Sequence, residues 1–157
     1  MDSETYHSIA GGWLGTYYYT ARTMLPVRFE ASFVRQSGGE AVESGGERFA
    51  GSVIDDDGGH DYATVSRGIQ QGTFVRFVKT YAPPEPGLFP VSYVGTMSGD
   101  GRTLTGHWKI ALTESRRARA REIVGTWEAR RIWTAVEGED AQDAGAGREL
   151  VGAGSGR

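Results

Sequence analysis

Hydrophobic and polar residues alternate most regularly just after Pro26. The apolar residues take every second position and polar residues lie between them: Val27, Phe29, Ala31 and Phe33 against Arg28, Glu30 and Ser32. A period of two is typical of a β-strand that buries one face and exposes the other. The pattern therefore predicts a strand that Pro26 opens.

Seven other segments also have the composition of strands, and turn-forming residues separate most of them. These predicted strands cover residues 12–20, 48–55, 60–69, 73–81, 91–97, 102–112 and 122–135. Two of the strands have residues that share a face by parity: Phe49, Gly51 and Val53 on one, and Ala63, Val65 and Ile69 on the other. Asp57-Gly58 is a favoured hairpin pair, and Gly-containing turns follow at 70–72 and 98–101.

Small and aromatic residues alternate on the first predicted strand, which reads G-G-W-L-G-T-Y-Y-Y-T over residues 11–20. The residues of one parity, which point to one face of a strand, are Gly11, Trp13, Gly15, Tyr17 and Tyr19. Glycine at alternate positions lets neighbouring aromatic rings lie across the backbone inside a tapering barrel. Gly-x-Trp occurs again at Trp108 and at Trp127, so the later strands repeat the arrangement.

Eight strands with mostly short connections and no helical pattern leave a sandwich or a barrel. Their meander-like order favours a single eight-stranded antiparallel up-and-down barrel, which also removes both sheet edges. We expect a polar lead-in over 1–10, the barrel over 11–136 and a disordered tail over 137–157, which is rich in Gly, Ala and acidic residues. Such a barrel is either filled by side chains or able to hold one small ligand.

Charge and composition exclude several classes of protein. The formal net charge of −3 over 157 residues argues against a general nucleic-acid binder. The absence of Cys excludes disulfides and thiol catalysis. The first residues are polar without an apolar signal region, and no apolar run reaches 18 residues, so we expect a soluble bacterial-type protein of the cytoplasm without a membrane partner.

Gly11-x-Trp13 on the first strand, with Arg130 or Arg131 on the last, resembles the calycin superfamily of lipocalins, fatty-acid-binding proteins and avidins. The resemblance covers about residues 11–135 as a spacing pattern. It implies a barrel in which the first-strand Trp lies at the closed end. It also implies that a basic side chain of the last strand packs across that Trp in a cation–π contact. Arg131 has the parity for this contact with Trp13.

The longer form Gly-x-Trp-x-Gly-x-Tyr over residues 11–17 is similar to the opening of the haem-binding nitrobindins, whose motif ends in Gly where this chain has Tyr17. The C-terminal His that ligates haem in that family has no counterpart here, because the last His is His107. We therefore expect no cofactor.

Aromatic residues would line the barrel lumen if Trp13 does. With Arg131, the predicted ligand-binding residues are Trp13, Tyr17, Tyr19, Phe29, Tyr93, Trp108 and Trp127. The rings would form a pocket for a flat or greasy molecule, with Tyr hydroxyls as hydrogen-bonding groups. The alternative interpretation is a packed core.

Acid–base chemistry would fall to Lys79, Tyr81 or Glu30. Lys79 and Tyr81 share a face of the strand over 73–81, but the pattern leaves open which face is buried. A Lys in an apolar lumen would have a lowered pKa and could act as a base or hold a carboxylate. The alternative is an outward Lys on a solvated face.

The remaining polar groups have structural explanations. His107 is expected on the surface if Trp108 faces inward, because the two have opposite parity. An acidic turn contains Asp55, Asp56, Asp57, His60 and Asp61, and a basic run contains Arg116, Arg117, Arg119 and Arg121. A hairpin and a solvated connector explain these, so we expect no metal site. No nucleophile elbow or phosphate-binding loop is present.

Three hypotheses follow. The first is a barrel that binds a small hydrophobic or aromatic molecule in its lumen. The second is a cyclase or isomerase that uses the same lumen mainly to position its substrate. The third is a filled-core interaction module that binds a partner through Leu88 and Phe89 of the Pro-rich loop 82–90, or forms a homodimer through a barrel wall.

Overall fold

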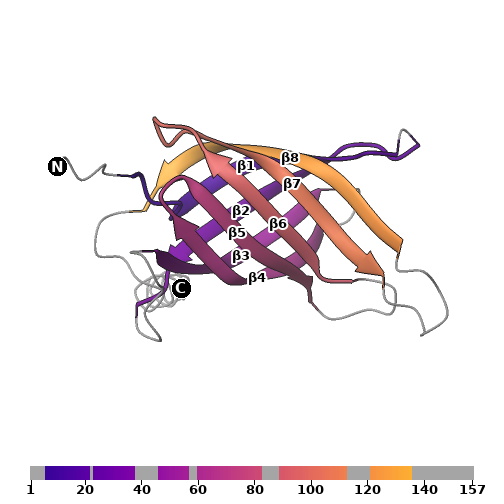
Figure 1. The fold of residues 1–157 in the computed structure, drawn as a ribbon, viewed down its shortest axis with the longest axis horizontal. Helices are drawn as coiled ribbons and strands as arrows, with labels where there is room; N and C mark the ends of the chain where they lie inside the picture. The colour runs from indigo at the N-terminus through magenta and orange to yellow at the C-terminus, as the bar shows by residue number, and fades with distance from the viewer. Residues whose placement is uncertain are drawn as a thin grey trace, which may run out of the picture.

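The chain folds into a closed antiparallel barrel of eight strands, shown in the computed structural model of Figure 1. The structure describes residues 6–21, 23–37, 46–56, 60–82, 89–112 and 121–135. The strands are β1 (Gly11–Tyr19), β2 (Val27–Arg35), β3 (Glu47–Asp56), β4 (His60–Gln71), β5 (Phe74–Tyr81), β6 (Val91–Met97), β7 (Thr103–Leu112) and β8 (Arg121–Thr134). Each predicted strand is found within two residues of its expected bounds.

Every strand pairs with the next one along the chain, and β8 closes the barrel by pairing with β1. This confirms the predicted up-and-down barrel. The floor end is where β1 begins, at the left of Figure 1, and the mouth end is where β1 ends. The strands alternate in direction, so β3 and β5 also end at the mouth end.

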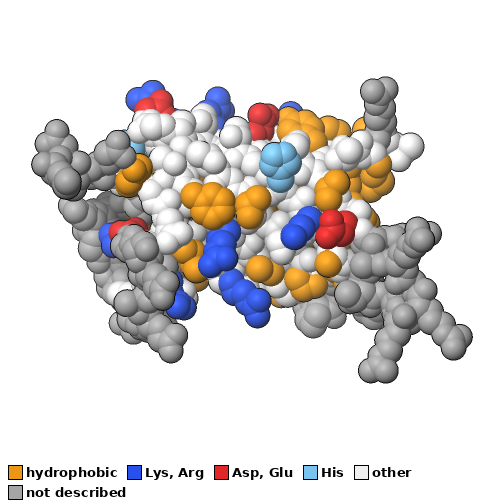
Figure 2. All heavy atoms as spheres, in the orientation of Figure 1, with side chains coloured by type: hydrophobic (Ala, Val, Ile, Leu, Met, Phe, Trp, Pro, Cys, Tyr) orange, Lys and Arg blue, Asp and Glu red, His pale blue; other side chains and the backbone are white. Residues whose placement is uncertain are grey.

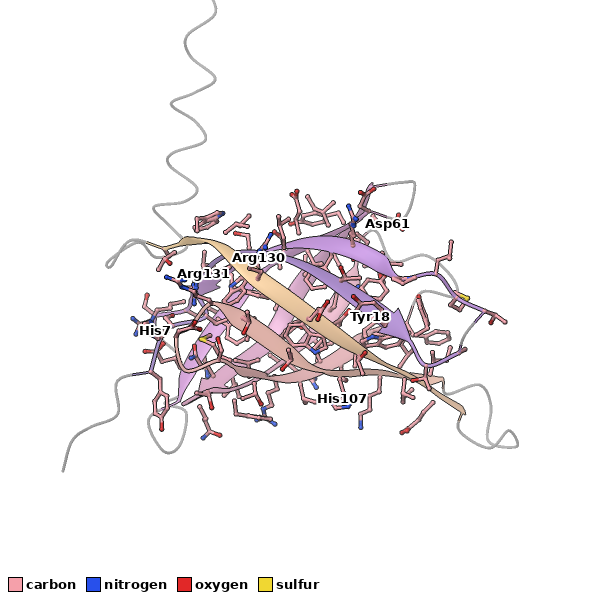
Figure 3. All side chains as sticks on the ribbon, turned by 90° about the horizontal axis from the view of Figure 1, so that it is seen from above. His7, Tyr18, Asp61, His107, Arg130 and Arg131 are labelled. Atoms are coloured by element: carbon pink, nitrogen blue, oxygen red, sulfur yellow. The ribbon has the colours of Figure 1, made fainter. Side chains whose placement is uncertain are left out.

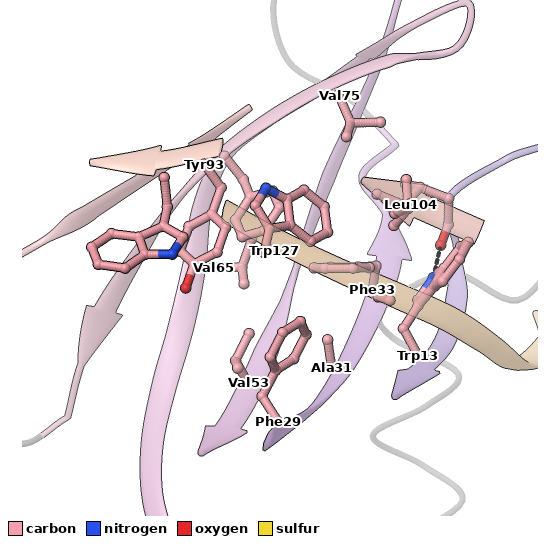
Figure 4. Close-up of a cluster of buried hydrophobic side chains, with 14 of the residues drawn as sticks. Trp13, Phe29, Ala31, Phe33, Val53, Val65, Val75, Tyr93, Leu104 and Trp127 are labelled. Carbon is pink, nitrogen blue, oxygen red and sulfur yellow. Dashed lines mark hydrogen bonds between the residues drawn. The ribbon is translucent and has the colours of Figure 1, made fainter. Parts of the chain in front are cut away.

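Aromatic rings fill the lumen (Figure 4). Phe77 and Tyr93 stack with ring centroids 4.8 Å apart, and Trp127 meets the Tyr93 ring edge-on. The ring of Trp127 lies over Gly95, and that of Trp108 lies over Gly125, which confirms the predicted role of alternating glycines. A cavity of about 10 Å³ remains beneath Lys79, which is space for about one water molecule. The described side chains therefore leave no ligand-sized void in this part of the lumen.

The N-terminal segment before β1 crosses the floor end. Ile9 is buried, and its carbonyl accepts a hydrogen bond from the Trp13 indole at 2.9 Å. The Arg131 guanidinium lies 4.4 Å from the Trp13 ring centroid and donates to the carbonyls of Ser8, Ala10 and Gly101. The predicted contact between the first-strand Trp and a basic residue of the last strand is thus confirmed for Arg131.

A second polar side chain fixes the same segment from the opposite wall. Buried Gln70 accepts from the Ile9 amide at 2.8 Å and donates to the carbonyls of His7 and Gly72. Because Arg131 and Gln70 satisfy the backbone of residues 7–10 from two sides, the floor is sealed by the chain itself.

The predicted orientation of Ile69, on the same face of β4 as Ala63 and Val65, is wrong. The pairing register shifts between Ser66 and Ile69, where Arg67 adopts a positive φ of 54°. This bulge reverses the parity, so Gly68 and Gln70 turn inward and Ile69 lies opposite Arg48 and Arg76, with the outward-facing residues. A β-bulge with a non-Gly residue at positive φ leaves no sign in a period-two pattern.

The outer wall is mixed in character. Figure 2 shows the face over β5, β6 and β7, where basic side chains lie beside hydrophobic ones. The exposed hydrophobic residues of these strands include Phe74 of β5 and Val94 of β6. Four features of the sequence lie outside the described residues: Asp57, Leu88, the run from Arg116 to Arg119, and the tail over 137–157.

Candidate functional site

A buried ion pair lies in the lumen toward the mouth end. Asp55 is the second-last residue of β3, and Lys79 lies near the end of β5. The Asp55 and Lys79 side chains are 1% and 2% exposed, and Lys79 Nζ lies 3.1 Å from Asp55 Oδ2 and 3.3 Å from Oδ1. Both residues have the inward parity of their strands, which they share with Val53 and Phe77.

Two tyrosines complete the coordination of the Asp55 carboxylate. Tyr17 of β1 donates its hydroxyl to Oδ2 at 3.1 Å, and Tyr81 of β5 donates to the same oxygen at 2.5 Å. The carboxylate therefore accepts hydrogen bonds from three side chains on two strands other than its own. Such a set of donors offsets much of the cost of burying a charge.

Aromatic rings surround the Lys79 ammonium. Its Nζ lies 4.6 Å from the centroid of the Tyr17 ring, 4.8 Å from that of Tyr81 and 5.6 Å from that of Tyr93. All three distances are within cation–π range, so the rings add to the stabilisation that Asp55 gives the ammonium. We call Asp55, Lys79, Tyr17 and Tyr81 the polar cluster.

The phenols of this region stay protonated at neutral pH. Burial, and then the negative charge of Asp55, raise the pKa of Tyr17 and of Tyr93 above the ordinary tyrosine value. Burial and the hydrogen bond to Asp55 raise the pKa of Tyr81. The Tyr17 and Tyr81 hydroxyls therefore act as neutral hydrogen-bond donors rather than as acids.

A wall of rings continues from the polar cluster toward the mouth end. Trp108 meets the Tyr19 ring edge-on at 5.0 Å and the Tyr17 ring at 6.0 Å, and Phe29 stacks on Tyr17 at 6.2 Å. Tyr19 and Tyr81 are only partly buried, in contrast to the rings deeper in the lumen. This end of the lumen is therefore where a molecule from solvent could reach the polar cluster.

The predicted ligand-binding residues separate into two groups. All seven aromatic side chains face inward, but Trp13 and Arg131 lie at the floor end, against the N-terminal segment. Tyr17, Tyr19, Phe29 and Trp108 lie toward the mouth end, near the polar cluster. Tyr93 and Trp127 pack between the groups. Whether any of them binds a ligand stays a prediction.

Two of the three acid–base candidates lie in the polar cluster, and the third does not. Lys79, for which an outward position was the alternative, faces inward. Glu30 is exposed on the outer face of β2, because it has the parity opposite to Phe29. The structure therefore does not bring Glu30 to the polar cluster. His107 is exposed on the outer wall, as expected from its parity (Figure 3).

Asp55 is the functional candidate that the sequence analysis missed. It was assigned to the acidic turn, whereas the strand continues through Asp56 and turns the Asp55 side chain inward. Its parity with Phe49 and Val53 was the available signal. Among the described residues no group of His, Asp or Glu is arranged to hold a metal ion.

The polar cluster can orient a small molecule. Its two formal charges cancel, so it favours a neutral polar group over an anion or a cation. A ligand carbonyl could accept from a tyrosine hydroxyl, and a ligand hydroxyl could donate to Asp55.

Neither a protein-family model, nor a curated protein, nor a solved structure matches the chain. Within the described ranges no helix has the length and apolar character needed to cross a membrane.

Proposed function

We propose that the barrel binds a small, neutral, hydrophobic or aromatic molecule at its mouth end, with the polar cluster orienting the molecule's hydroxyl or carbonyl group. The calycin-like pairing of Trp13 with Arg131 at a sealed floor supports this assignment of the two ends, and we propose membership of the calycin superfamily on the same contact.

The observation that carries the proposal is the ion pair of Asp55 and Lys79 within an otherwise apolar core. A buried ion pair is seldom more stabilising than well-packed apolar side chains of the same volume, so its presence needs another reason. The pair lies at the end of the lumen opposite the sealed floor, next to partly buried Tyr19 and Tyr81. Binding of a ligand is a reason that fits this position.

Exposed apolar side chains near the mouth end also support a hydrophobic ligand. Met24 and Leu25 lie in the β1–β2 connection, and Leu25 is 83% exposed. Ile123, near the start of β8, is exposed as well. Because the void within the lumen holds about one water molecule, binding would require the ring of Tyr19, which lies outside the polar cluster, to move aside. Partly buried side chains can change rotamer at lower cost than the packed rings beneath them.

The protonated phenols favour binding over acid–base catalysis. A tyrosine with a raised pKa is a weak proton donor at neutral pH. The Lys79 ammonium donates to Asp55 and has no lone pair with which to accept a proton. The polar cluster thus has the properties of a fixed hydrogen-bonding surface.

Native mass spectrometry of protein purified from its own host tests the proposal first, because a bound molecule would add to the mass and could be extracted. A titration with naphthol, naphthalene and naphthoate, followed by side-chain NMR, tests the chemistry. We expect naphthol to bind most tightly and to shift the signals of Tyr17 and Trp108. Tyr17→Phe should weaken binding of naphthol, whereas the control Tyr62→Phe, on an exposed tyrosine of β4, should not.

Binding of naphthol that is equally tight in the Tyr17→Phe variant, or signals that shift only on the outer wall, would contradict the proposal. The absence of both a co-purifying molecule and any probe binding would contradict it more broadly.

A further inference from the structure

The outer wall around β1 carries a groove that is separate from the polar cluster. The groove has a volume of about 870 Å³ and crosses five neighbouring strands, from β7 through β8, β1 and β2 to β3. Its base is Leu14, Gly15 and Thr16 of β1, where Gly15 contributes no side chain. Charged side chains of β2 and β8 stand on either side of this base.

The pairing register arranges four charges around β1 with alternating sign. Leu14 pairs with Arg130 of β8 on one side and with Glu30 of β2 on the other. Two residues along, Thr16 pairs with Glu128 on the β8 side and with Arg28 on the β2 side. At each level of β1, a positive charge on one flank is therefore matched by a negative charge on the other.

These charges are exposed on the outer wall, and Figure 3 shows Arg130 beside β1 there. Within the part of the chain that the structure describes, Arg28, Glu30 and Arg130 form no salt bridge. Arg130 and Glu30 lie two strands apart, about 10 Å at the backbone, on either side of Leu14. Glu128 accepts a hydrogen bond from the Tyr18 hydroxyl at 2.9 Å, which holds its carboxylate on this wall.

We propose that this wall binds a second copy of the chain, with a two-fold axis that runs along β1 in the plane of the interface. Such an axis places β8 of one copy over β2 of the other, because it exchanges the two flanks of β1. Arg130 then meets Glu30 of the second copy, and Glu128 meets Arg28. Each of these two contacts occurs twice, so every one of the four charges on each copy faces an opposite charge.

The uncharged residues of the wall fit the same axis. Leu14, which is 39% exposed, meets its own equivalent on the axis, and so does Thr16. The axis also exchanges β7 with β3, which brings the exposed Ile54 of β3 toward Thr103 of β7. A two-fold axis across the strands would instead face Ile54 toward Asp56, an apolar group against a carboxylate. The charges favour a second copy over an unrelated partner, since the pattern is complementary to itself.

Charge reversal tests this dimer directly. We expect sedimentation velocity to show a concentration-dependent dimer of the full chain. Glu30→Arg alone places Arg against Arg130, and Arg130→Glu alone places Glu against Glu30, so each variant should dimerise at least about tenfold more weakly. An equimolar mixture of the two variants should form a heterodimer, because both contacts then join opposite charges. Arg76→Glu, on the outer face of β5, is the matched control and should dimerise like the wild type.

Circular dichroism of each variant separates loss of dimerisation from loss of folding, and recovery in the mixture does so independently. A wild-type chain that stays monomeric up to near-millimolar concentration would overturn the proposal, as would single variants that dimerise normally. Recovery on mixing Arg130→Glu with Glu128→Arg, but not with Glu30→Arg, would overturn the axis along β1. None of these outcomes depends on ligand binding at the mouth end.

Discussion

Removing the ammonium of Lys79 should destabilise the barrel far more than removing an ammonium or guanidinium from its surface. Lys79→Met keeps most of the volume of the side chain and deletes its charge. The Asp55 carboxylate then stays fully buried with two tyrosine hydroxyls as its remaining side-chain donors. A buried charge that loses its counter-ion has no compensation from water.

The magnitude follows from the geometry of the pair. At 3.1 Å and an effective dielectric constant of about 20, the attraction of the two charges is about 5 kcal/mol. Breaking a buried pair by removal of one partner costs about 3–5 kcal/mol in other proteins. We expect the Lys79→Met variant to lose an amount in this range. The double variant Asp55→Asn, Lys79→Met should regain most of it, because no charge is left buried.

Urea unfolding followed by tryptophan fluorescence gives the free energies, at one fixed protein concentration so that association does not contribute. Arg35→Met is the control. Arg35 pairs with Glu47 at 2.8 Å, but the two side chains are 55% and 40% exposed, so its loss should cost less than about 1 kcal/mol. If Lys79→Met cost no more than Arg35→Met, or if the double variant were as unstable as the single one, the reasoning from burial would be refuted.

Three further predictions concern the floor, the wall and a turn. Arg131→Met should cost about 2–4 kcal/mol in urea unfolding, because the side chain loses three carbonyl partners and the Trp13 ring. Gly125→Ala should lower the thermal midpoint strongly, because a Cβ there would overlap the Tyr18 carbonyl oxygen of β1. Gly99→Ala should leave the midpoint nearly unchanged, because a Cβ there would have no atom within 4 Å. Hydrogen bonds from the Ser98 hydroxyl and the Arg102 amide hold the pKa of Asp100 below its ordinary value. The ionised Asp100 carboxylate therefore stabilises the fold above about pH 4, the ordinary pKa of the unfolded chain. This contribution is lost as the pH falls through the pKa that Asp100 has in the folded protein. In a pH series of unfolding midpoints, Asp100→Asn should therefore fall below the wild type at neutral pH and converge with it in acid.

The alternation of residues along each strand was enough to predict the barrel and most of its core. The pattern around Phe29 places its inward face without any knowledge of the partner strands, because one face of an antiparallel strand must be buried. Parity failed at Arg67, where a bulge inserts a residue and reverses the faces of β4. Nothing in the local sequence marks that position, since Arg is not a residue that favours a positive φ.

The polar cluster was harder to predict because its evidence is pairwise. Lys79 alone is more often an outward residue, and Asp55 alone fits a turn. Each can face inward only because the opposite charge of the other offsets the cost of burying it. The two residues lie on β3 and β5, which are not neighbours in the barrel because β4 lies between them. Two oppositely charged residues at inward-facing positions of two strands, both near the same end of the barrel, form the pattern that would have indicated the pair.

The floor described above sets the order in which the protein can form. Arg131 reaches carbonyls 121 and 123 residues earlier in the chain, and β1 has its β8 neighbour only after all the other strands of the barrel have been made. During synthesis, the first strand can pair with β2 but must wait with its other edge unpaired. Contacts of such long sequence separation form slowly, and an unpaired strand edge is open to other chains until they do. Closure of this barrel is therefore a late event in its folding, and the newly made barrel segment is most vulnerable to aggregation just before Arg131 reaches the segment that precedes β1.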